Sequence, residues 1–193
     1  NTFHGYLNDK ASNPIKNGAD LLLASNVFAH SDDLKSMAES MKKLIKPKGK
    51  IIIEVQYLLN TIKDLTFDNI YHEHTNYWSL STLNIFFKNI NLKLFKVEKI
   101  NTHGGSLRVY VSQEQDILID ISVETLLKEE EDFGLRDIST YLDFGRKVKN
   151  LKNTVIENLK ILKRKHPIIV GYGAPAKATT ALNFFNITKE IDF

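Results

Sequence analysis

Hydrophobic and polar positions in the first third of the chain predict alternating strands and helices. Residues 19–26 have an uninterrupted apolar centre, which predicts a buried parallel strand covered on both faces. Residues 33–45 place apolar side chains at helical spacing, and Pro47 ends that helix. Residues 50–55 form a second apolar strand. Strand, helix and strand with short connections predict the βαβ unit of an α/β sheet.

The middle of the chain predicts a helix followed by a hairpin. Residues 79–89 have a helical apolar stripe. Residues 92–100 and 106–112 have the composition of strands, and the connection between them contains a Gly-Gly pair. A glycine pair between two short apolar runs is typical of an antiparallel hairpin.

The last third of the chain predicts a helical connection and then a new sheet. Residues 113–123 indicate a loop and a boundary, and residues 122–165 are helical and highly charged. We interpret the charged block at 128–132 as a solvated helix face. Residues 168–177 then predict a strand, a glycine-rich turn and the start of a helix. We therefore predict two domains, at residues 1–118 and 119–193.

Composition narrows the class of protein. Of 193 residues, 42% are hydrophobic and 25% are charged, which is enough apolar material for a packed core. The 26 basic residues are interleaved with 23 acidic ones, so we expect no nucleic-acid partner. Without cysteine there is no thiolate metal site. No apolar run approaches the ~20 residues of a membrane span, and we expect a cytoplasmic protein without a membrane partner.

The segment Tyr71-His72-Glu73-His74 carries the most concentrated chemistry in the sequence. Apolar and aromatic residues surround it, so it is either a buried hydrogen-bonded network or a site of proton transfer. A metal site is a third interpretation. The histidines are two apart rather than four, so a third ligand would have to come from elsewhere, and His30 and His103 are available.

Two further segments have the pattern of ligand-binding turns. His30 follows the first strand, at the edge where ligands bind in open α/β sheets. Residues 171–177, Gly-Tyr-Gly-Ala-Pro-Ala-Lys, join a predicted strand to a predicted helix. Glycines and a helix start can hold a phosphate, although such a turn also occurs without a ligand in Rossmann-like sheets.

Five stretches, taken in order, resemble S-adenosylmethionine-dependent C3 methyltransferases of nucleotide-linked deoxysugars. The stretches are ASNVFAHSDDL at 24–34, IEVQYLL at 53–59, FDNIYHEH at 67–74, HGGSLRVY at 103–110 and GYGAPAK at 171–177. The resemblance implies an α/β fold in which a Rossmann-like class I methyltransferase sheet, ending in an antiparallel hairpin, precedes a helical segment. The start of a second Rossmann-like domain, which binds the sugar nucleotide, follows.

The resemblance also implies the chemistry. The substrate would be a nucleoside-diphosphate sugar, with dTDP the expected nucleotide, and His74 would remove the C3 proton beside a 4-keto group to give an enolate. Tyr71, Glu73 and His30 are the other implied catalytic residues. The implied cofactor is S-adenosylmethionine, and its implied contacts are Ser25 and Asn26. The implied substrate contacts are His103, Gly104, Arg108, Tyr172, Gly173 and Lys177.

Two features of the family that the sequence resembles are missing from this sequence. We find neither the cysteine-rich zinc-binding domain nor the glycine-rich cofactor loop, so we expect a fragment or truncated form whose activity alone is in doubt. Zinc is expected only in the missing domain, and we predict no metal here. Two other functions stay open: a non-catalytic nucleotide-sugar or dinucleotide-binding module, and a histidine-based metal hydrolase.

Overall fold

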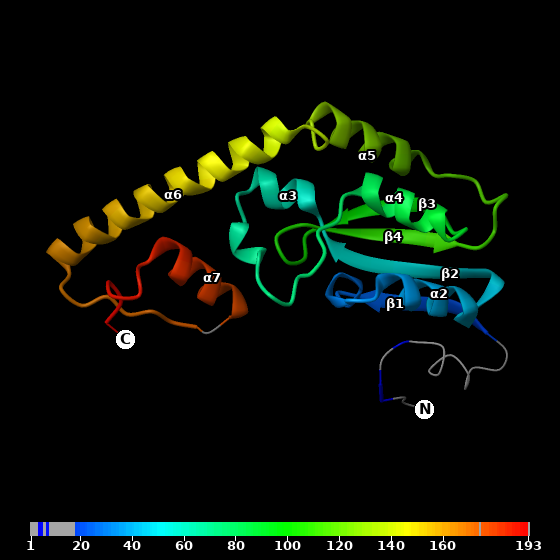
Figure 1. Cartoon of the computed structure of the whole chain (residues 1–193), viewed down its shortest axis with the longest axis horizontal. Coiled ribbons are helices and arrows are strands. Elements are labelled where there is room, and N and C mark those ends of the chain that lie inside the picture. The colour runs from blue at the N-terminus through cyan, green and yellow to red at the C-terminus, as the bar shows by residue number, and fades with distance from the viewer. Residues whose placement is uncertain (1–3, 6, 8–17, 174, 193) are drawn as a thin grey trace. The chain divides into compact units, whose positions relative to one another are not determined.

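The computed structural model, which describes residues 4, 5, 7, 18–173 and 175–192, contains a four-stranded mixed sheet in the order β1-β2-β4-β3 (Figure 1). Strand β1 (Ala19–Ser25) is parallel to β2 (Ile45–Gln56). Strand β4 (Ser106–Ser112) is antiparallel to both β2 and β3 (Lys93–Ile100). The parallel βαβ unit and the antiparallel hairpin are therefore confirmed.

Helices begin where the sequence supplies capping side chains. Asp33 accepts a hydrogen bond from the Ser36 amide, and Ser79 forms a capping box with Thr82. The helices are η1 (Phe28–His30), α2 (Leu34–Leu44), α3 (Leu58–Lys63), η2 (Phe67–Asn69), α4 (Leu80–Asn89), α5 (Ile121–Asp132), α6 (Ile138–Lys165) and α7 (Ala176–Phe185). Within the described part of the chain, every helix is too short or too polar to span a membrane.

The chain forms two compact units that each combine separate stretches of sequence. The first contains the described residues up to Leu59 together with Thr75–Leu135, and it includes the sheet. The second contains Asn60–His74 and the described residues from Arg136 onward. The segment 71–74 and the turn at 171–177 therefore belong to the same unit, although about a hundred residues of sequence separate them.

Strand β2 is buried on one face, whereas β1 is more exposed than its sequence predicts. Ile51, Ile53 and Val55 are at most 1% exposed, and the residues between them are half-buried. In β1, Leu21 and Leu23 are 51% and 67% exposed. The prediction that this strand is covered on both faces is wrong. Among the described strands β1 pairs with β2 alone, and it lies at the edge of the sheet.

Gly49 permits the close approach of β1 and β2. A Cβ atom at this position would lie 2.8 Å from the Ala19 carbonyl oxygen and 3.0 Å from that of Lys46. These are main-chain atoms, which cannot rotate away as a side chain can. The glycine therefore lets β2 pass close to the main chain at Ala19 and Lys46.

Two predicted elements at the C-terminal end differ from the structure. The single helical stretch predicted for 122–165 is divided into α5 and α6, and Gly134 between them has a left-handed φ of 74°. The strand predicted at 168–170 is absent from the described residues. The amide and carbonyl of Ile169 bond to Asp192, both at 2.8 Å, so their partner is one residue and not a neighbouring strand.

The charged block on α5 is not uniformly solvated, because Glu130 is only 3% exposed. Its carboxylate accepts hydrogen bonds from the Leu80 amide at 2.5 Å and the Ser81 amide at 2.9 Å, at the start of α4. Burial, and then the charge of Glu130, raises the pKa of the Tyr57 hydroxyl well above its usual range. The predicted solvated face is wrong at this residue, whose carboxylate holds the N-terminus of α4.

We predict that Glu130→Ala lowers the free energy of unfolding by about 2 kcal/mol, because two helix-start amides lose a buried charged acceptor. Urea denaturation followed by circular dichroism measures the change. Glu131→Ala, which removes an exposed carboxylate from the same helix, is the matched control and should change stability by less than about 0.5 kcal/mol. Equal effects of the two substitutions would contradict the capping role.

Candidate functional site

The second unit contains a histidine whose ring nitrogens have distinct partners. His74 Nδ1 lies 2.7 Å from the Asn69 carbonyl oxygen, and His74 Nε2 lies 3.2 Å from the Tyr71 hydroxyl. A carbonyl oxygen can only accept, so Nδ1 carries the proton. In the neutral ring Nε2 is then the unprotonated nitrogen and accepts from Tyr71. The arrangement presents Nε2 as a base.

The segment that carries His74 is fixed to α7 by aromatic packing. Phe67 is 8% exposed, and its ring centroid lies 4.9 Å from that of Phe184 and 5.2 Å from that of Phe185. Asn69 is 2% exposed, and its amide donates to the Thr66 carbonyl at 3.1 Å. The carbonyl that orients His74 therefore belongs to a buried, internally bonded turn.

The other two residues of the cluster face solvent. The side chains of His72 and Glu73 are 86% and 56% exposed, and the closest approach of their charged groups is 4.0 Å. Partial burial, and then the charge of Glu73, raises the pKa of Tyr71, which keeps its hydroxyl protonated and able to donate. This exposure argues against a fully buried polar network. Across the described residues, no group of three or more histidine, aspartate or glutamate side chains is placed to hold a metal ion.

The predicted anion-binding turn lies in the same unit as His74. Gly173 has a φ of 110°, and α7 begins at Ala176, next to the half-buried Lys177. Tyr172 is fully exposed, and Ala174 lies outside the described residues. One turn further along α7, the Thr180 hydroxyl donates to the Ile70 carbonyl at 3.4 Å. Thus α7 begins at the turn and contacts the residue that precedes Tyr71.

In the first unit, Glu54 connects three of the residues assigned from the sequence. Ser25 Oγ donates to one Glu54 carboxylate oxygen at 2.6 Å, and Arg108 Nε donates to the other at 2.7 Å. The Asn26 amide donates to the Glu54 carbonyl at 3.1 Å. The hydrogen bonds from Ser25 and Arg108 lower the pKa of Glu54. Sequence reasoning gave Glu54 no role, although a carboxylate near the end of an apolar strand was the signal.

Aromatic packing and side-chain hydrogen bonds together hold the turn that carries His30. Phe28 is fully buried, and its ring packs within 5.8 Å, centroid to centroid, of three other rings. The Ala29 carbonyl accepts from the Thr75 hydroxyl at 3.1 Å and from the Asn76 amide group at 3.4 Å. These two residues directly follow His74 in the chain. The exposed His30 is thus presented on a rigid turn at the carboxyl end of β1.

The β3–β4 hairpin turn presents His103 and Gly104 to solvent. Both residues are exposed and have left-handed φ angles of 52° and 83°. The turn is attached to the start of the segment after β2, because the Tyr57 amide donates to the Gly105 carbonyl at 3.1 Å. His103 therefore lies on a fixed turn.

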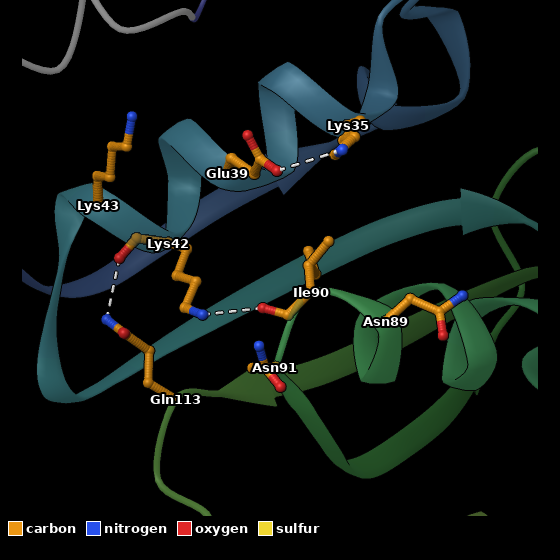
Figure 2. Close-up of a pocket in the computed structure, with 8 residues that line it drawn as sticks. All are labelled: Lys35, Glu39, Lys42, Lys43, Asn89, Ile90, Asn91 and Gln113. Atoms are coloured by element: carbon orange, nitrogen blue, oxygen red, sulfur yellow. Dashed lines mark hydrogen bonds and ion pairs between the residues drawn. The ribbon is translucent and has the colours of Figure 1, made fainter.

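A groove of about 500 Å³ lies elsewhere, between α2 and the turn that follows α4 (Figure 2). None of the residues assigned from the sequence lines it. The Lys42 ammonium crosses to the Ile90 carbonyl at 2.9 Å, and the Gln113 side-chain amide donates to the Lys42 and Ile45 carbonyls at 2.9 and 3.1 Å. These polar groups serve the ends of helices, so the groove is explained by packing.

The four-stranded mixed sheet and the helices that accompany it define an α/β fold. Residues 1–97 match the family described as a methyltransferase domain, and residues 101–193 match the C-methyltransferase C-terminal domain. The chain belongs to the methyltransferase domain family, and its residues 101–193 are similar to the C-methyltransferase C-terminal domain.

The C-methyltransferase NovU of Streptomyces niveus is 30% identical over 165 residues. The match covers 85% of this chain but only 39% of NovU, so the chain spans about two fifths of that relative's length. A methyltransferase domain implies S-adenosylmethionine as the methyl donor.

Solved structures give weaker likenesses. A putative methyltransferase in complex with the Trm112 activator of Haloferax volcanii matches with a TM-score of 0.43 and 15% identity, over 51% of this chain and 55% of that one. TnmH matches with a TM-score of 0.41 and 19% identity, over 50% of this chain and 31% of that one. An O-methyltransferase family protein from Burkholderia thailandensis matches with a TM-score of 0.40 and 14% identity, over 59% of this chain and 36% of that one.

We predict that neutral His74 carries its proton on Nδ1, because the Asn69 carbonyl can only accept a hydrogen bond. Nitrogen NMR of labelled imidazoles, above the usual pKa range of histidine, should show a protonated Nδ1 and an unprotonated Nε2. Tyr71→Phe should leave this tautomer in place. The exposed His72 ring is the internal control and should give signals averaged between two tautomers. A proton on His74 Nε2 would contradict the assignment.

Proposed function

We propose that this chain is part of an S-adenosylmethionine-dependent C-methyltransferase that acts at C3 of a nucleotide-linked 4-keto-deoxysugar. The observation that carries the proposal is the fixed His74 ring, whose Nδ1 bonds to a main-chain carbonyl and whose Nε2 is left as the base. The C-methyltransferase C-terminal domain and the relative NovU, itself described as a C-methyltransferase, support carbon as the methylated atom.

The first step is removal of a proton from sugar carbon. The 4-keto group acidifies the C3 proton, and His74 Nε2 accepts it, leaving an enolate whose charge lies largely on the C4 oxygen. Once Nε2 carries that proton it no longer accepts a hydrogen bond from Tyr71. The Tyr71 hydroxyl is then free to donate to the enolate oxygen. Taking up the proton and stabilising the new charge are thereby coupled within one cluster.

Glu73 and His30 have supporting roles in the proposal. The exposed Glu73 carboxylate accepts a hydrogen bond from a sugar hydroxyl. His30 acts with Tyr71 on the enolate oxygen, either directly or through water. Within the first unit, hydrogen bonds from Thr75 and Asn76 hold the turn that bears His30.

The methyl donor fits the carboxyl end of β1. The Ser25 hydroxyl donates to Glu54 and its Oγ accepts from the Asn26 side-chain amide at 3.4 Å, which leaves one acceptor lone pair at the exposed strand end. An acceptor here suits the ammonium and ribose hydroxyl groups of S-adenosylmethionine, and we assign Ser25 and Asn26 to hold it. The bound donor supplies an electrophilic methyl group.

The nucleoside diphosphate occupies the turn that begins α7. Lys177 supplies a cation for the diphosphate, Gly173 permits close approach of the backbone, and Tyr172 offers an exposed ring. His103, Gly104 and Arg108 are the further substrate contacts. The turn and His74 belong to one compact unit, which supports a common role in holding the substrate beside its base.

We predict that His74→Ala abolishes deuterium exchange at C3 of a dTDP-linked 4-keto-6-deoxysugar in D₂O without methyl donor. Loss of a positioned base should slow the exchange by about 10²–10⁴-fold. Proton NMR of the sugar measures the rate. His72→Ala removes an exposed histidine from the same segment and should exchange within about twofold of the unchanged chain.

Two results of this experiment separate the competing functions. Exchange that survives in His74→Ala shows that another group is the base. A chain that binds the nucleotide sugar with no exchange at C3 is the non-catalytic binding module, and the proposed chemistry is then wrong.

We predict that Lys177→Ala weakens binding of dTDP about tenfold, because one charge-assisted hydrogen bond to the diphosphate is lost. Isothermal titration calorimetry measures the dissociation constant. Lys189→Ala removes an exposed lysine beyond the end of α7 and should leave the affinity unchanged. Equal affinities for all three proteins would exclude Lys177 as a phosphate contact.

A further inference from the structure

Four polar residues form a row across the sheet, one from each strand. Ser25 of β1 is in register with Glu54 of β2, Glu54 with Arg108 of β4, and Arg108 with Glu98 of β3. Side chains at paired positions lie on the same face of a sheet, so the four can interact directly. The row crosses the sheet near the carboxyl end of β1. It ends at Ser25, which is one of the two proposed cofactor contacts.

Hydrogen bonds and one ion pair connect the row from one end to the other. Arg108 contacts one Glu54 carboxylate oxygen through both Nε, at 2.7 Å, and a terminal nitrogen, at 2.6 Å. The other Glu54 oxygen accepts from Ser25 at 2.6 Å. The second terminal nitrogen of Arg108 lies 3.6 Å from Glu98, which also accepts from the Tyr110 hydroxyl at 2.9 Å. Each oxygen of Glu54 therefore has a different partner.

The bonds to Glu54 fix the end of β1 in two ways. Its side chain accepts a hydrogen bond from the Ser25 hydroxyl, and this bond sets the direction of the Ser25 lone pairs. Its main-chain carbonyl accepts from the Asn26 amide, where Asn26 has a left-handed φ of 53°. Asparagine adopts this conformation more readily than most residues, and the hydrogen bond holds it there. The Glu54 side chain thus orients the Ser25 hydroxyl, and the Glu54 main chain holds the Asn26 backbone.

We propose that Glu54, held by Arg108, is a positioning residue that sets Ser25 and Asn26 for binding the methyl donor. The inference rests on the proposed function, because it takes Ser25 and Asn26 as cofactor contacts. It also gives Arg108 a role besides substrate binding, since the guanidinium neutralises Glu54 and keeps its carboxylate available to Ser25. If the Arg108–Glu54 ion pair only stabilised the sheet, Glu54 would not also need to bond to Ser25.

The test compares Glu54→Gln with Glu98→Gln. Both changes remove one carboxylate beside Arg108, but only Glu54 reaches Ser25. The glutamine has one acceptor oxygen, which cannot serve Ser25 and Arg108 as the two carboxylate oxygens do. Calorimetric titration with S-adenosylhomocysteine should show about tenfold weaker binding for Glu54→Gln and a change within about twofold for Glu98→Gln.

A double-mutant cycle separates positioning from a general structural effect. If Glu54 acts through Ser25, then Glu54→Gln should weaken S-adenosylhomocysteine binding much less in a Ser25→Ala background than in the unchanged chain. Additive effects, or equal losses in Glu54→Gln and Glu98→Gln, overturn the proposal. Thermal melting confirms that each variant is folded.

Amide hydrogen exchange tests the positioning in the absence of any ligand. The Asn26 amide should exchange at least about tenfold faster in Glu54→Gln than in Glu98→Gln, because disturbing the side-chain bonds of Glu54 to Ser25 and Arg108 loosens the strand end where the main-chain carbonyl of residue 54 accepts from Asn26. An unchanged Asn26 rate overturns the positioning role whatever the chain binds. Faster exchange in a chain without affinity for S-adenosylhomocysteine leaves the positioning intact and contradicts the assigned cofactor site.

Discussion

The hydrogen bond from His74 Nδ1 to the Asn69 carbonyl determines the chemistry of the 71–74 segment, and it depends on the apolar packing of its neighbours. Phe67 packs between aromatic side chains of α7, so the turn that contains Asn69 has little freedom to move. A carbonyl fixed in this way selects one tautomer of the imidazole without using a second charged group. Hydrophobic packing thereby determines which nitrogen of the neutral ring is unprotonated.

In the first unit, the carboxylates of Glu130 and Glu54 each form hydrogen bonds that connect elements distant in sequence. Glu130 of α5 binds the first amides of α4, fifty and forty-nine residues earlier in the chain. Glu54 of β2 binds Ser25 of β1 and Arg108 of β4. Removal from water penalises a carboxylate unless donors replace the lost hydration, and in both cases several donors converge on it.

The sequence predicted the elements whose causes are local. The helix starts at Asp33 and Ser79 and the glycine pair of the hairpin were recognisable because each depends on residues close in sequence. The failures were non-local. The exposure of Leu23 depends on which strands flank β1, and the burial of Glu130 depends on where α4 begins. The strand predicted around Ile169 is absent from the described residues because a strand exists only through its partner.

For the candidate site, the sequence by itself determined the kinds of residue and their order: a Tyr-His-Glu-His segment, a histidine after a strand, and a glycine-rich turn before a helix. It could not distinguish the roles of His72 and His74 by pattern, since the two have the same chemistry and similar neighbours. The tertiary structure separated them by exposing one ring and bonding the other to a buried turn. It also brought Glu54 to Ser25 and Arg108, because strand pairing joins positions that sequence distance keeps apart.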